Sequence, residues 1–514
     1  MFGMSVGSMG RGNSDRFTVE AWLSHRLSFG VLIAAVSIYY LFLLSNGTFR
    51  LFGPELFGKA FNNMLLHMLR GEFTVDPDVI GYEGFPRDGK TYAYFGVFLA
   101  LLRLPAMPFT DLARAELARL SCLAAVVIFV ALQLRLLLSV HSSLPEQSRT
   151  PDLLAVTTIA TVLSGPQVYI LASAWIYHEP ILWSAAMAAA FNLIVTRAAF
   201  VRRGLRERDL LWLATLAGFS LLTRPSVGAG LYLGAALLVC WMALHRHSID
   251  LAQPGVLAKG KAFLAMTREL VTDPRLSAPI GILAALAVAV GWVNFERWGS
   301  PFTFADFRYQ QFADFQANGM EVVHDFGQFN LGRLWIGALY YGTGIPWILK
   351  SLPSFAEYLH ARYTGIEPPP VAPLLTNPIT VLLAAAGLYQ LWWKPGISRD
   401  CAAILWLTLI GHSFTVLLIF AAMFLALRYR FDLAPFMTLA AAVGYRHAST
   451  TMAGMPETRR KRLRIAGAGL CLLGIFCSHY ALILHKVWSA GVPLEVRASL
   501  LPLSPVSPFL PGGK

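Results

Sequence analysis

The sequence predicts an all-α polytopic membrane protein with about eleven transmembrane helices and two large outer loops that contain juxtamembrane helices. First, 56% of the 514 residues are hydrophobic and only 14% are charged, whereas soluble domains carry roughly 25% charged residues. Second, the chain has many apolar stretches, although several are shorter than the roughly 20 residues of an average crossing. We place eleven of them at residues 27–45, 117–139, 153–173, 181–200, 210–223, 227–244, 279–294, 374–393, 402–426, 431–445 and 465–485.

The third observation is the sorting of charge between the loops. When the loops are assigned alternately to two sides, with the N-terminus inside, the inner set holds 23 of the 42 Lys and Arg residues and 11 of the 29 Asp and Glu residues. The outer set holds the other 19 basic and 18 acidic residues, so nearly all of the net charge of +13 lies on one side. Cytoplasmic loops are expected to be basic in this way. Topology therefore explains the basic composition, and nucleic acid is not implied as a partner.

This assignment divides the chain into three parts. Residues 1–26 are expected to form a cytoplasmic tail, residues 27–485 the transmembrane domain, and residues 486–514 an outer C-terminal tail. The outer loops 46–116 and 295–373 are too long to be simple connectors, because unstructured loops of such length are uncommon unless they are functional. We therefore expect the chemistry at the outer surface of the membrane.

Three segments could be placed relative to the membrane in more than one way. Residues 93–108 are apolar, but a crossing there would invert every later loop, so we interpret them as a juxtamembrane helix. Residues 56–70 have apolar side chains at helical spacing, which predicts an amphipathic helix that either lies in the lipid interface or packs on the bundle. The pair 210–223 and 227–244 predicts two short helices with Arg224 at the outer turn, because one 35-residue helix would be too long for a crossing at ~1.5 Å per residue.

The first outer loop contains the candidate catalytic groups. Its carboxylates Glu55, Asp76, Asp78 and Glu83 are candidates for a general base, since a carboxylate partly desolvated against a membrane-embedded ligand accepts a proton readily. Because several carboxylates share one loop, a divalent metal is compatible with the sequence, although no ligand spacing requires one. The alternative for each carboxylate is a place in a solvated, turn-rich loop.

Candidate substrate-binding residues follow in the same loop. Arg87 has the forked geometry that suits a phosphate, and Lys90 supplies a point charge. Asp88 and Tyr92 lie beside them and are included in the predicted site. The alternative is again a solvated surface turn.

Two further polar groups flank the outer ends of apolar segments. His178 and Glu179 precede Pro180, where Glu179 either caps the next helix or binds substrate, since a carboxylate is favourable at a helix N-terminus. His178 is either a hydrogen-bonding residue at the interface or a proton carrier. Arg308 and Tyr309 in the second outer loop are either interfacial anchors or contacts for a lipid phosphate.

The strongest functional candidate is the segment Arg428-Tyr429-Arg430-Phe431-Asp432, at the outer junction of two apolar spans. Charged side chains at such depth are costly unless they are paired or face a cavity. An anionic lipid headgroup would satisfy both arginines, so we include Arg428, Tyr429, Arg430 and Asp432 in the predicted site together with Arg224.

In this order and on these sides of the membrane, the motifs resemble the membrane glycosyltransferases of the GT-C superfamily, which includes the protein O-mannosyltransferases and the lipid A aminoarabinose transferases. The resemblance extends over most of the chain. It rests on the acidic loop after the first helix, on Glu179-Pro180, and on the element from Arg428 to Pro435. The stretches 84–96 and 298–301 also look like a bacterial subgroup of such proteins.

The resemblance implies an inverting glycosyltransferase that moves a sugar from a polyprenyl-phosphate carrier to a glycolipid, polysaccharide or protein acceptor of the cell envelope. It would act at the periplasmic face of a bacterial inner membrane, with the N-terminus cytoplasmic and the C-terminus periplasmic. In the family a carboxylate of the first outer loop deprotonates the acceptor, and basic residues hold the carrier phosphate.

This chain departs from the family pattern at Asn62-Asn63, where an acidic residue is common, so the base remains among four carboxylates with Glu55 slightly favoured. The alternative functions are a lipid or oligosaccharide transporter of the envelope and a non-catalytic partner in envelope assembly.

Overall fold

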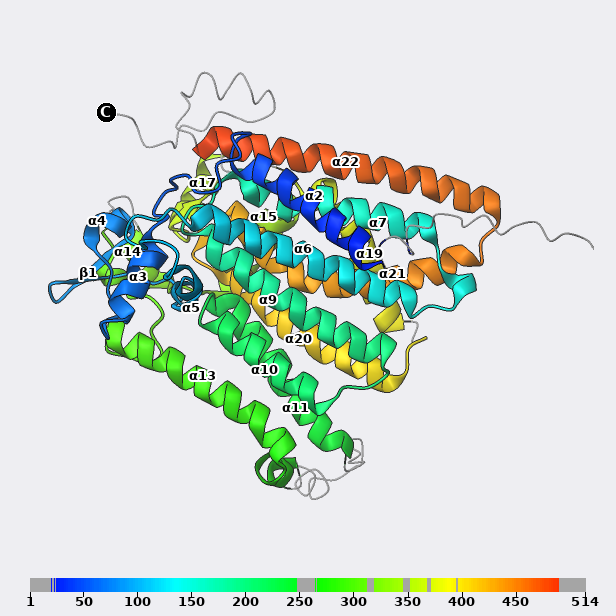
Figure 1. Ribbon diagram of the computed structural model, residues 1–514, viewed down its shortest axis with the longest axis horizontal. Helices are drawn as coiled ribbons and strands as arrows, with labels where there is room; N and C mark the ends of the chain where they lie inside the picture. The colour runs from blue at the N-terminus through cyan, green and yellow to red at the C-terminus, as the bar shows by residue number, and fades with distance from the viewer. Residues whose placement is uncertain are drawn as a thin grey trace, which may run out of the picture.

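The structure is a computed structural model that describes residues 20, 23, 25–246, 264, 266–311, 319–344, 352–367, 371–393 and 396–489. Most of the predicted tail 1–26 and most of the predicted tail 486–514 lie outside these residues. All eleven apolar segments fold mainly as helices (Figure 1), although 153–173 is interrupted at 164–165 and the helix in 402–426 ends at Ala421, before a short strand. These helices are α2 (Arg26–Leu44), α6 (Ala118–Ser142), α7 (Pro151–Leu163), α9 (His178–Thr196), α10 (Glu207–Leu221), α11 (Pro225–Arg246), α13 (Pro274–Trp298), α19 (Pro378–Trp393), α20 (Arg399–Ala421), α21 (Ala434–Ala453) and α22 (Glu457–Ser489).

Eight helical stretches in the described part of the chain are long and apolar enough to cross a membrane. Two of these stretches join shorter pieces, because α7 continues through α8 (Pro166–Tyr169) and η4 (Ile170–Ala172), and α9 continues into the π-helix η5 (Arg197–Val201). The protein is thus a helical, polytopic membrane protein. Eleven crossings would require α10, α19 and α21 to span the bilayer as well.

Contacts at the two ends of the bundle show that helices distant in sequence lie side by side. At one end, Lys486 of α22 donates to the Leu43 carbonyl of α2. At the other end, Arg464 of α22 pairs with Asp152 of α7 at 3.2 Å. We call the first end, which carries residues 46–116, the loop end; it lies at the side of α3, α4 and β1 in Figure 1.

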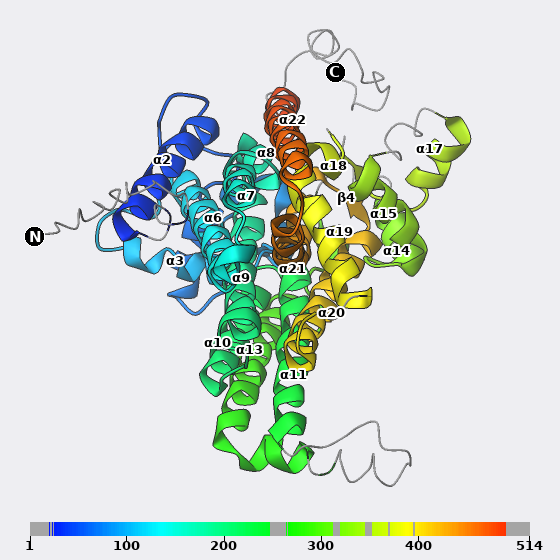
Figure 2. The same ribbon diagram turned by 90° about the vertical axis from the view of Figure 1, so that its right-hand side faces the viewer.

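Close approach of small residues holds α19 against α21, which pack side by side near the centre of the bundle (Figure 2). A Cβ atom at Gly444 would lie 1.7 Å from the Leu383 carbonyl oxygen, and one at Gly387 would lie 2.0 Å from the Ala440 carbonyl oxygen. Membrane helices associate mainly through such packing, because lipid tails are as apolar as leucine side chains. Replacing either glycine would therefore force these two helices apart.

The predicted break between residues 210–223 and 227–244 is confirmed. Helix α10 ends at Leu221, and α11 begins at Pro225, which suits the first turn of a helix. Arg224 therefore lies in the short turn at the loop end of the bundle.

Residues 46–116 fold into short elements that pack on the bundle. These elements are α3 (Ala60–Met68), α4 (Pro77–Ile80), η1 (Gly81–Glu83), β1 (Phe85–Arg87), β2 (Lys90–Tyr92), α5 (Phe98–Leu101) and η2 (Leu104–Ala106). Residues 93–108 thus contain only two short helical turns, neither of them long enough to cross a bilayer. Helix α3 is buried on several sides, so the packing alternative for 56–70 is the one that the structure supports.

The antiparallel hairpin β1–β2 is an addition to the all-α prediction. Its turn is Asp88-Gly89, and both residues have positive φ, of 53° and 72°. Two-residue hairpins favour Asp-Gly for this reason, so the signal was present in the sequence. Arg87 and Lys90 pair across the two strands.

The described parts of residues 295–373, which the sequence predicts as the second outer loop, also fold into short elements. These are η6 (Phe307–Tyr309), α14 (Met320–Phe326), η8 (Leu331–Arg333), α15 (Leu334–Thr343), α17 (Pro353–His360), β3 (Gly365–Ile366) and α18 (Pro373–Thr376). Strand β3 pairs in parallel with β4 (Phe424–Leu425), which directly precedes the 3-10 helix η9 (Leu427–Leu433). This pairing brings Gly365–Ile366 beside Phe424–Leu425, close to the charged segment 427–433. The remaining short helix, η3 (Glu146–Ser148), lies at the opposite end of the bundle.

Candidate functional site

Helix η9 arranges the charged segment 427–433 in a definite order. In a 3-10 helix, residues three apart share a face. Tyr429 and Asp432 are three apart, and both contact Arg224: its guanidinium carbon lies 4.7 Å from the centre of the Tyr429 ring, and its nitrogens donate to Asp432 over 2.5–2.9 Å. Arg224 thus joins the turn between α10 and α11 to η9.

The Arg224–Asp432 pair is buried at the loop end. The Asp432 side chain is 1% exposed, and burial raises the pKa of its carboxyl group, an effect that Arg224 opposes. Removing one partner of a buried ion pair is strongly destabilising, because the other charge is then left buried and unpaired. The pair therefore fixes the position of η9.

Arg428 is the centre of a second set of contacts. It forms an ion pair with Glu367, which follows β3, and Glu367 also accepts a hydrogen bond of 2.9 Å from the Leu427 amide. The Arg428 guanidinium carbon lies 4.7 Å from the centre of the Tyr177 ring and 5.4 Å from that of Tyr429. A cation surrounded by aromatic faces is favourable when it is shielded from water.

Glu83, in η1 of the predicted first outer loop, also contacts this group of residues. The Tyr177 hydroxyl donates a 2.5 Å hydrogen bond to Glu83. Burial raises the pKa of the Glu83 carboxyl group, whereas the Tyr177 hydrogen bond and the charge of Arg428 lower it. Burial of Tyr94 raises the pKa of its hydroxyl group, and the nearby Glu83 charge raises it further. Glu83 is therefore a partly desolvated carboxylate whose pKa is raised chiefly by burial, as suits a general base.

Two histidines border the same region. The ring centres of His178, at the start of α9, and His485, near the end of α22, are 6.1 Å apart. The side chain of His178 is buried, and Trp175 packs edge-on against it at 6.2 Å. We call the assembled group Glu83, Tyr94, Tyr177, His178, Arg224, Glu367, Arg428, Tyr429, Asp432 and His485 the outer cluster.

Arg430 lies on the other side of η9, at a largely apolar cavity of about 340 Å³. It donates hydrogen bonds to the carbonyls of Val371 and Tyr340, the latter over 3.2 Å. Leu374, which lines the cavity, is 51% exposed, so the cavity reaches the molecular surface. Other apolar lining residues are Phe129, Tyr169, Tyr341, Phe420 and Met437. Helix η9 therefore borders both an apolar cavity and the outer cluster and contributes an arginine to each.

Glu55 occupies a different environment. One of its carboxylate oxygens accepts a 2.6 Å hydrogen bond from Arg119, and the other accepts the Ala174 amide at 3.2 Å. It lines a separate cavity of about 650 Å³ that also contains Lys486 and Trp175. Both Glu55 oxygens are thus engaged, one of them by the Arg119 guanidinium.

The other predicted catalytic carboxylates lie near the surface of the first outer loop. Asp76 accepts hydrogen bonds from the Asn63 side chain at 2.5 Å and its backbone amide donates to Asn63 at 2.9 Å. His67 lies 3.2 Å from Asp76, and Asp78 is exposed on α4. The structure does not bring either carboxylate into the outer cluster.

Glu179 is buried in an ion pair. Arg103 donates to it over 2.6 Å, and both side chains are at most 4% exposed. Arg103 also donates to Asn62 over 2.9 Å, and Asn62 donates in turn to the Leu112 carbonyl over 3.0 Å. Asn62 thus takes part in a network of hydrogen bonds and one ion pair that joins α3 to α9 through Arg103, so this position has a structural role.

The predicted residues around the hairpin form a second polar group. Arg87 donates to the Arg297 carbonyl over 2.9 Å and pairs with Asp88, Lys90 pairs with Glu72, and Tyr92 packs at 5.9 Å from Trp298. Arg308 pairs with Asp306 at 2.6 Å, and the guanidinium carbon of Arg87 lies 5.8 Å from the Tyr309 ring centre. Among the described residues, none of these predicted side chains forms a hydrogen bond or ion pair with Arg428.

Sequence reasoning did not select Glu367, Tyr94, Tyr177 or His485. Glu367 and His485 are distant from the other motifs along the chain, and tertiary pairing alone brings them to Arg428. Tyr177, by contrast, directly precedes His178, and its position just before the predicted helix 181–200 could have identified it.

A metal site cannot be assigned from these residues. Within the ranges that the structure describes, His, Cys, Asp and Glu side chains do not gather in groups of three or more that would hold a metal ion.

Comparison with known proteins finds similar solved structures at low sequence identity. No family model matches the chain, and no curated protein matches it. The chain is similar to the oligosaccharyltransferase of Archaeoglobus fulgidus in its apo form, with 12% identity and a TM-score of 0.45 over 96% of this chain and 62% of that one. It is also similar to AglB from the same organism in complex with an inhibitory peptide and a dolichol-phosphate, with 14% identity and a TM-score of 0.44 over 96% and 62% of the two chains.

A third similar structure is the same oligosaccharyltransferase in complex with Zn and sulfate, with 13% identity and a TM-score of 0.42 over 94% of this chain and 58% of that one. The chain therefore spans about six tenths of the length of these solved structures.

Proposed function

We propose that the protein is an inverting glycosyltransferase that moves a sugar from a polyprenyl-phosphate carrier to a hydroxyl group of an envelope acceptor. The arrangement around η9 is the observation that carries this proposal. An apolar cavity with Arg430 at its wall lies on one side of the helix, and the outer cluster with Glu83 and Arg428 lies on the other. A lipid-linked phosphate ester has an apolar chain and a charged phosphate, so its binding site needs an apolar cavity and basic side chains close together.

The reaction follows from these groups as a single displacement. Glu83 accepts the proton of the acceptor hydroxyl, and the acceptor oxygen forms a bond to the anomeric carbon of the sugar. The bond between that carbon and the carrier phosphate oxygen breaks, and the phosphate departs with the electron pair. Arg428 and Arg430 stabilise the charge that develops on the phosphate, and attack from the opposite face inverts the anomeric centre.

The membrane orientation belongs to the same proposal. The loop end would face the periplasm of a bacterial inner membrane, with the N-terminus in the cytoplasm and the C-terminus in the periplasm. The sorting of basic residues to the opposite loops supports this orientation. The partners are then the lipid-linked sugar donor and a glycolipid, polysaccharide or protein acceptor, in the membrane or at its surface.

The pH dependence of transfer tests the role of Glu83. Only its deprotonated form accepts a proton, so activity should fall as the pH falls through its pKa, which burial raises. The Tyr177 hydrogen bond lowers that pKa. We therefore expect Tyr177→Phe to move the acid limb of the kcat/KM profile to higher pH. An acid limb that stays in place, or moves to lower pH, would contradict this assignment.

The apolar cavity should bind the carrier chain, which a filling substitution can test. Ala338 lines the cavity, and Ala338→Phe adds a bulky ring to its wall. We expect KM for the lipid-linked donor to rise about tenfold, because overpacking costs typically ~1–3 kcal/mol. Ala284→Phe, on the exposed side of α13, is the matched control and should leave KM unchanged. Equal KM values for the two variants would show that the carrier chain does not bind in this cavity.

Assays of the purified protein distinguish sugar transfer from lipid transport. In detergent with extracted membrane lipids as donor and acceptor, a transferase converts a lipid-linked sugar into a new product that mass spectrometry detects. A transporter leaves the lipid chemically unchanged and requires a closed vesicle to show activity. Product formation in detergent supports the proposal, whereas flipping of unchanged lipid in vesicles without product would replace it with transport.

A further inference from the structure

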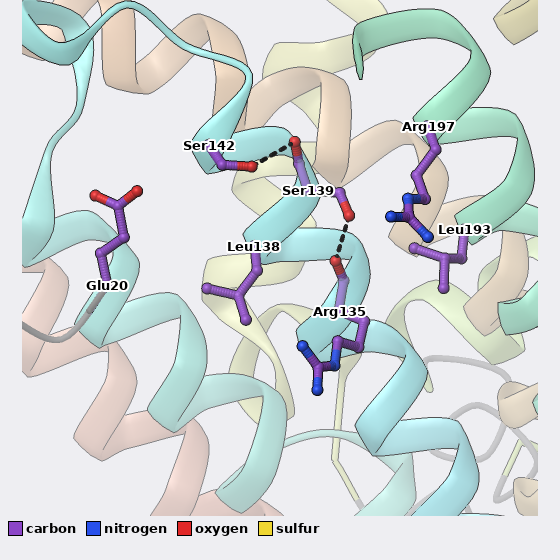
Figure 3. A pocket seen from close by; sticks show the side chains of 7 residues that line it. All are labelled: Glu20, Arg135, Leu138, Ser139, Ser142, Leu193 and Arg197. Atoms are coloured by element: carbon purple, nitrogen blue, oxygen red, sulfur yellow. Dashed lines mark hydrogen bonds between the residues drawn. The ribbon is translucent and has the colours of Figure 1, made fainter. Parts of the chain in front are cut away.

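A polar cavity lies at the end of the bundle opposite to the loop end, between the last turns of α6 and α9 (Figure 3). Its volume is about 470 Å³. The residues that line it are Glu20, Arg135, Leu138, Ser139, Ser142, Leu193 and Arg197. None of these residues belongs to the outer cluster, and no step of the proposed reaction uses them.

Two arginines from different helices face this cavity. Arg135 projects from α6, and its guanidinium carbon lies 3.8 Å from the centre of the Phe29 ring of α2, which orients it. Arg197 begins the π-helix η5 at the end of α9, and π-helical turns occur frequently at functional sites. Figure 3 shows the Arg197 side chain directed toward α6, whereas the Arg135 side chain turns to the side of α6 away from Arg197. Both side chains are exposed, and in the described ranges neither guanidinium forms an ion pair with a carboxylate.

The negative groups around the cavity leave a net positive charge. Glu20 is engaged by Arg149 at 3.0 Å and by His141 at 3.4 Å. The C-terminal ends of α6 and α9 each contribute only about half a negative charge. Two full positive charges on Arg135 and Arg197 exceed these contributions.

The hydroxyl groups of the cavity complete its polar lining. Ser139 donates to the Arg135 carbonyl over 2.8 Å, and Ser142 donates to the Ser139 carbonyl over 3.4 Å. Leu138 and Leu193 supply apolar wall beside them. A ligand with an anionic head and an apolar body fits this combination of two guanidinium groups, two hydroxyls and leucine side chains.

We propose that Arg135 and Arg197 bind the phosphate group of an anionic phospholipid at the membrane surface that charge sorting predicts to be cytoplasmic. Arginine presents parallel N–H donors that match phosphate oxygens. Basic pockets between transmembrane helices on the cytoplasmic side bind anionic headgroups, and the leaflet there is rich in anionic lipid. A soluble phosphate would use the same chemistry, so the experiment includes both sources.

Lipid retention measured by native mass spectrometry tests this site. Full-length protein is purified from nanodiscs of neutral phosphatidylcholine with added phosphatidylglycerol, and bound phosphatidylglycerol is counted. We expect the Arg135→Gln/Arg197→Gln variant to retain about thirtyfold less of it, since each arginine near the surface contributes roughly 1 kcal/mol. The matched control is Arg208→Gln/Arg462→Gln, which removes the same charge from exposed positions of the same end.

Each outcome has one meaning. Loss of bound lipid in the pocket variant but not in the control supports the proposal. Equal retention, or equal loss, in the two variants overturns it, because the lipid would then respond only to general surface charge. Binding of inorganic phosphate to lipid-free protein, abolished by the pocket variant, would keep the phosphate site but assign it to a soluble ligand. An Arg135→Lys/Arg197→Lys variant checks folding, and it should recover part of the retention.

Discussion

Replacing Glu83 by Gln is expected to lower kcat for sugar transfer by about 10²- to 10⁴-fold, the usual contribution of a general base. The substitution keeps the size of the side chain and its ability to accept the Tyr177 hydrogen bond. It removes the negative charge and the capacity to take up a proton from the acceptor. Binding of the lipid-linked donor should change little, because the arginines on η9 remain in place. Transfer kinetics with purified protein measure both quantities.

Two matched variants keep this prediction specific. Glu72→Gln removes a carboxylate of the same loop that pairs with Lys90 at the surface, and it should leave kcat unchanged. Glu55→Gln removes the carboxylate that sequence reasoning slightly favoured, and we expect a smaller effect than that of Glu83→Gln. A loss confined to Glu55→Gln would move the base to the cavity beside Lys486 and Trp175.

Removing Arg103 should produce the largest loss of stability. Arg103→Met leaves Glu179 buried without its partner, and breaking a buried pair in this way costs roughly 3–5 kcal/mol in the free energy of unfolding. The Asn62 oxygen also loses its donor. Denaturant titration in mixed micelles measures the loss.

The double variant Arg103→Met/Glu179→Gln separates the mechanism from a general packing defect. It removes both charges, so it should recover a substantial part of the stability lost in Arg103→Met. If the double variant is as unstable as the sum of the two single variants, the ion pair is not the cause. An unchanged free energy of unfolding in Arg103→Met would show that the pair contributes nothing.

The helical framework could be predicted from the sequence because membrane helices are encoded locally. Each apolar segment became a helix, and the break at Arg224 followed from length and from the basic flanks. The hairpin at Asp88-Gly89 was missed because its residues were interpreted as ligand-binding groups, although the dipeptide is a strong turn signal.

The candidate site could be predicted only in part. The segment 428–432 was identified because charge at that depth is costly. The partner of Arg428 was not, because Glu367 reaches it through the pairing of β3 with β4 between distant segments. Periodicity along the chain also could not distinguish Glu83 from the other carboxylates, because burial against Tyr177 depends on the assembled fold.

The most direct test of the central claim compares envelope glycolipids and lipid-linked sugars by mass spectrometry. The strains are a deletion strain and the same strain complemented with the wild-type gene or with the Glu83→Gln variant. We predict a product that lacks one fixed sugar mass in the deletion and Glu83→Gln strains, with the corresponding lipid-linked donor accumulating. A chemically intact product in the deletion strain, whose precursor has only changed membrane side, would contradict a transferase.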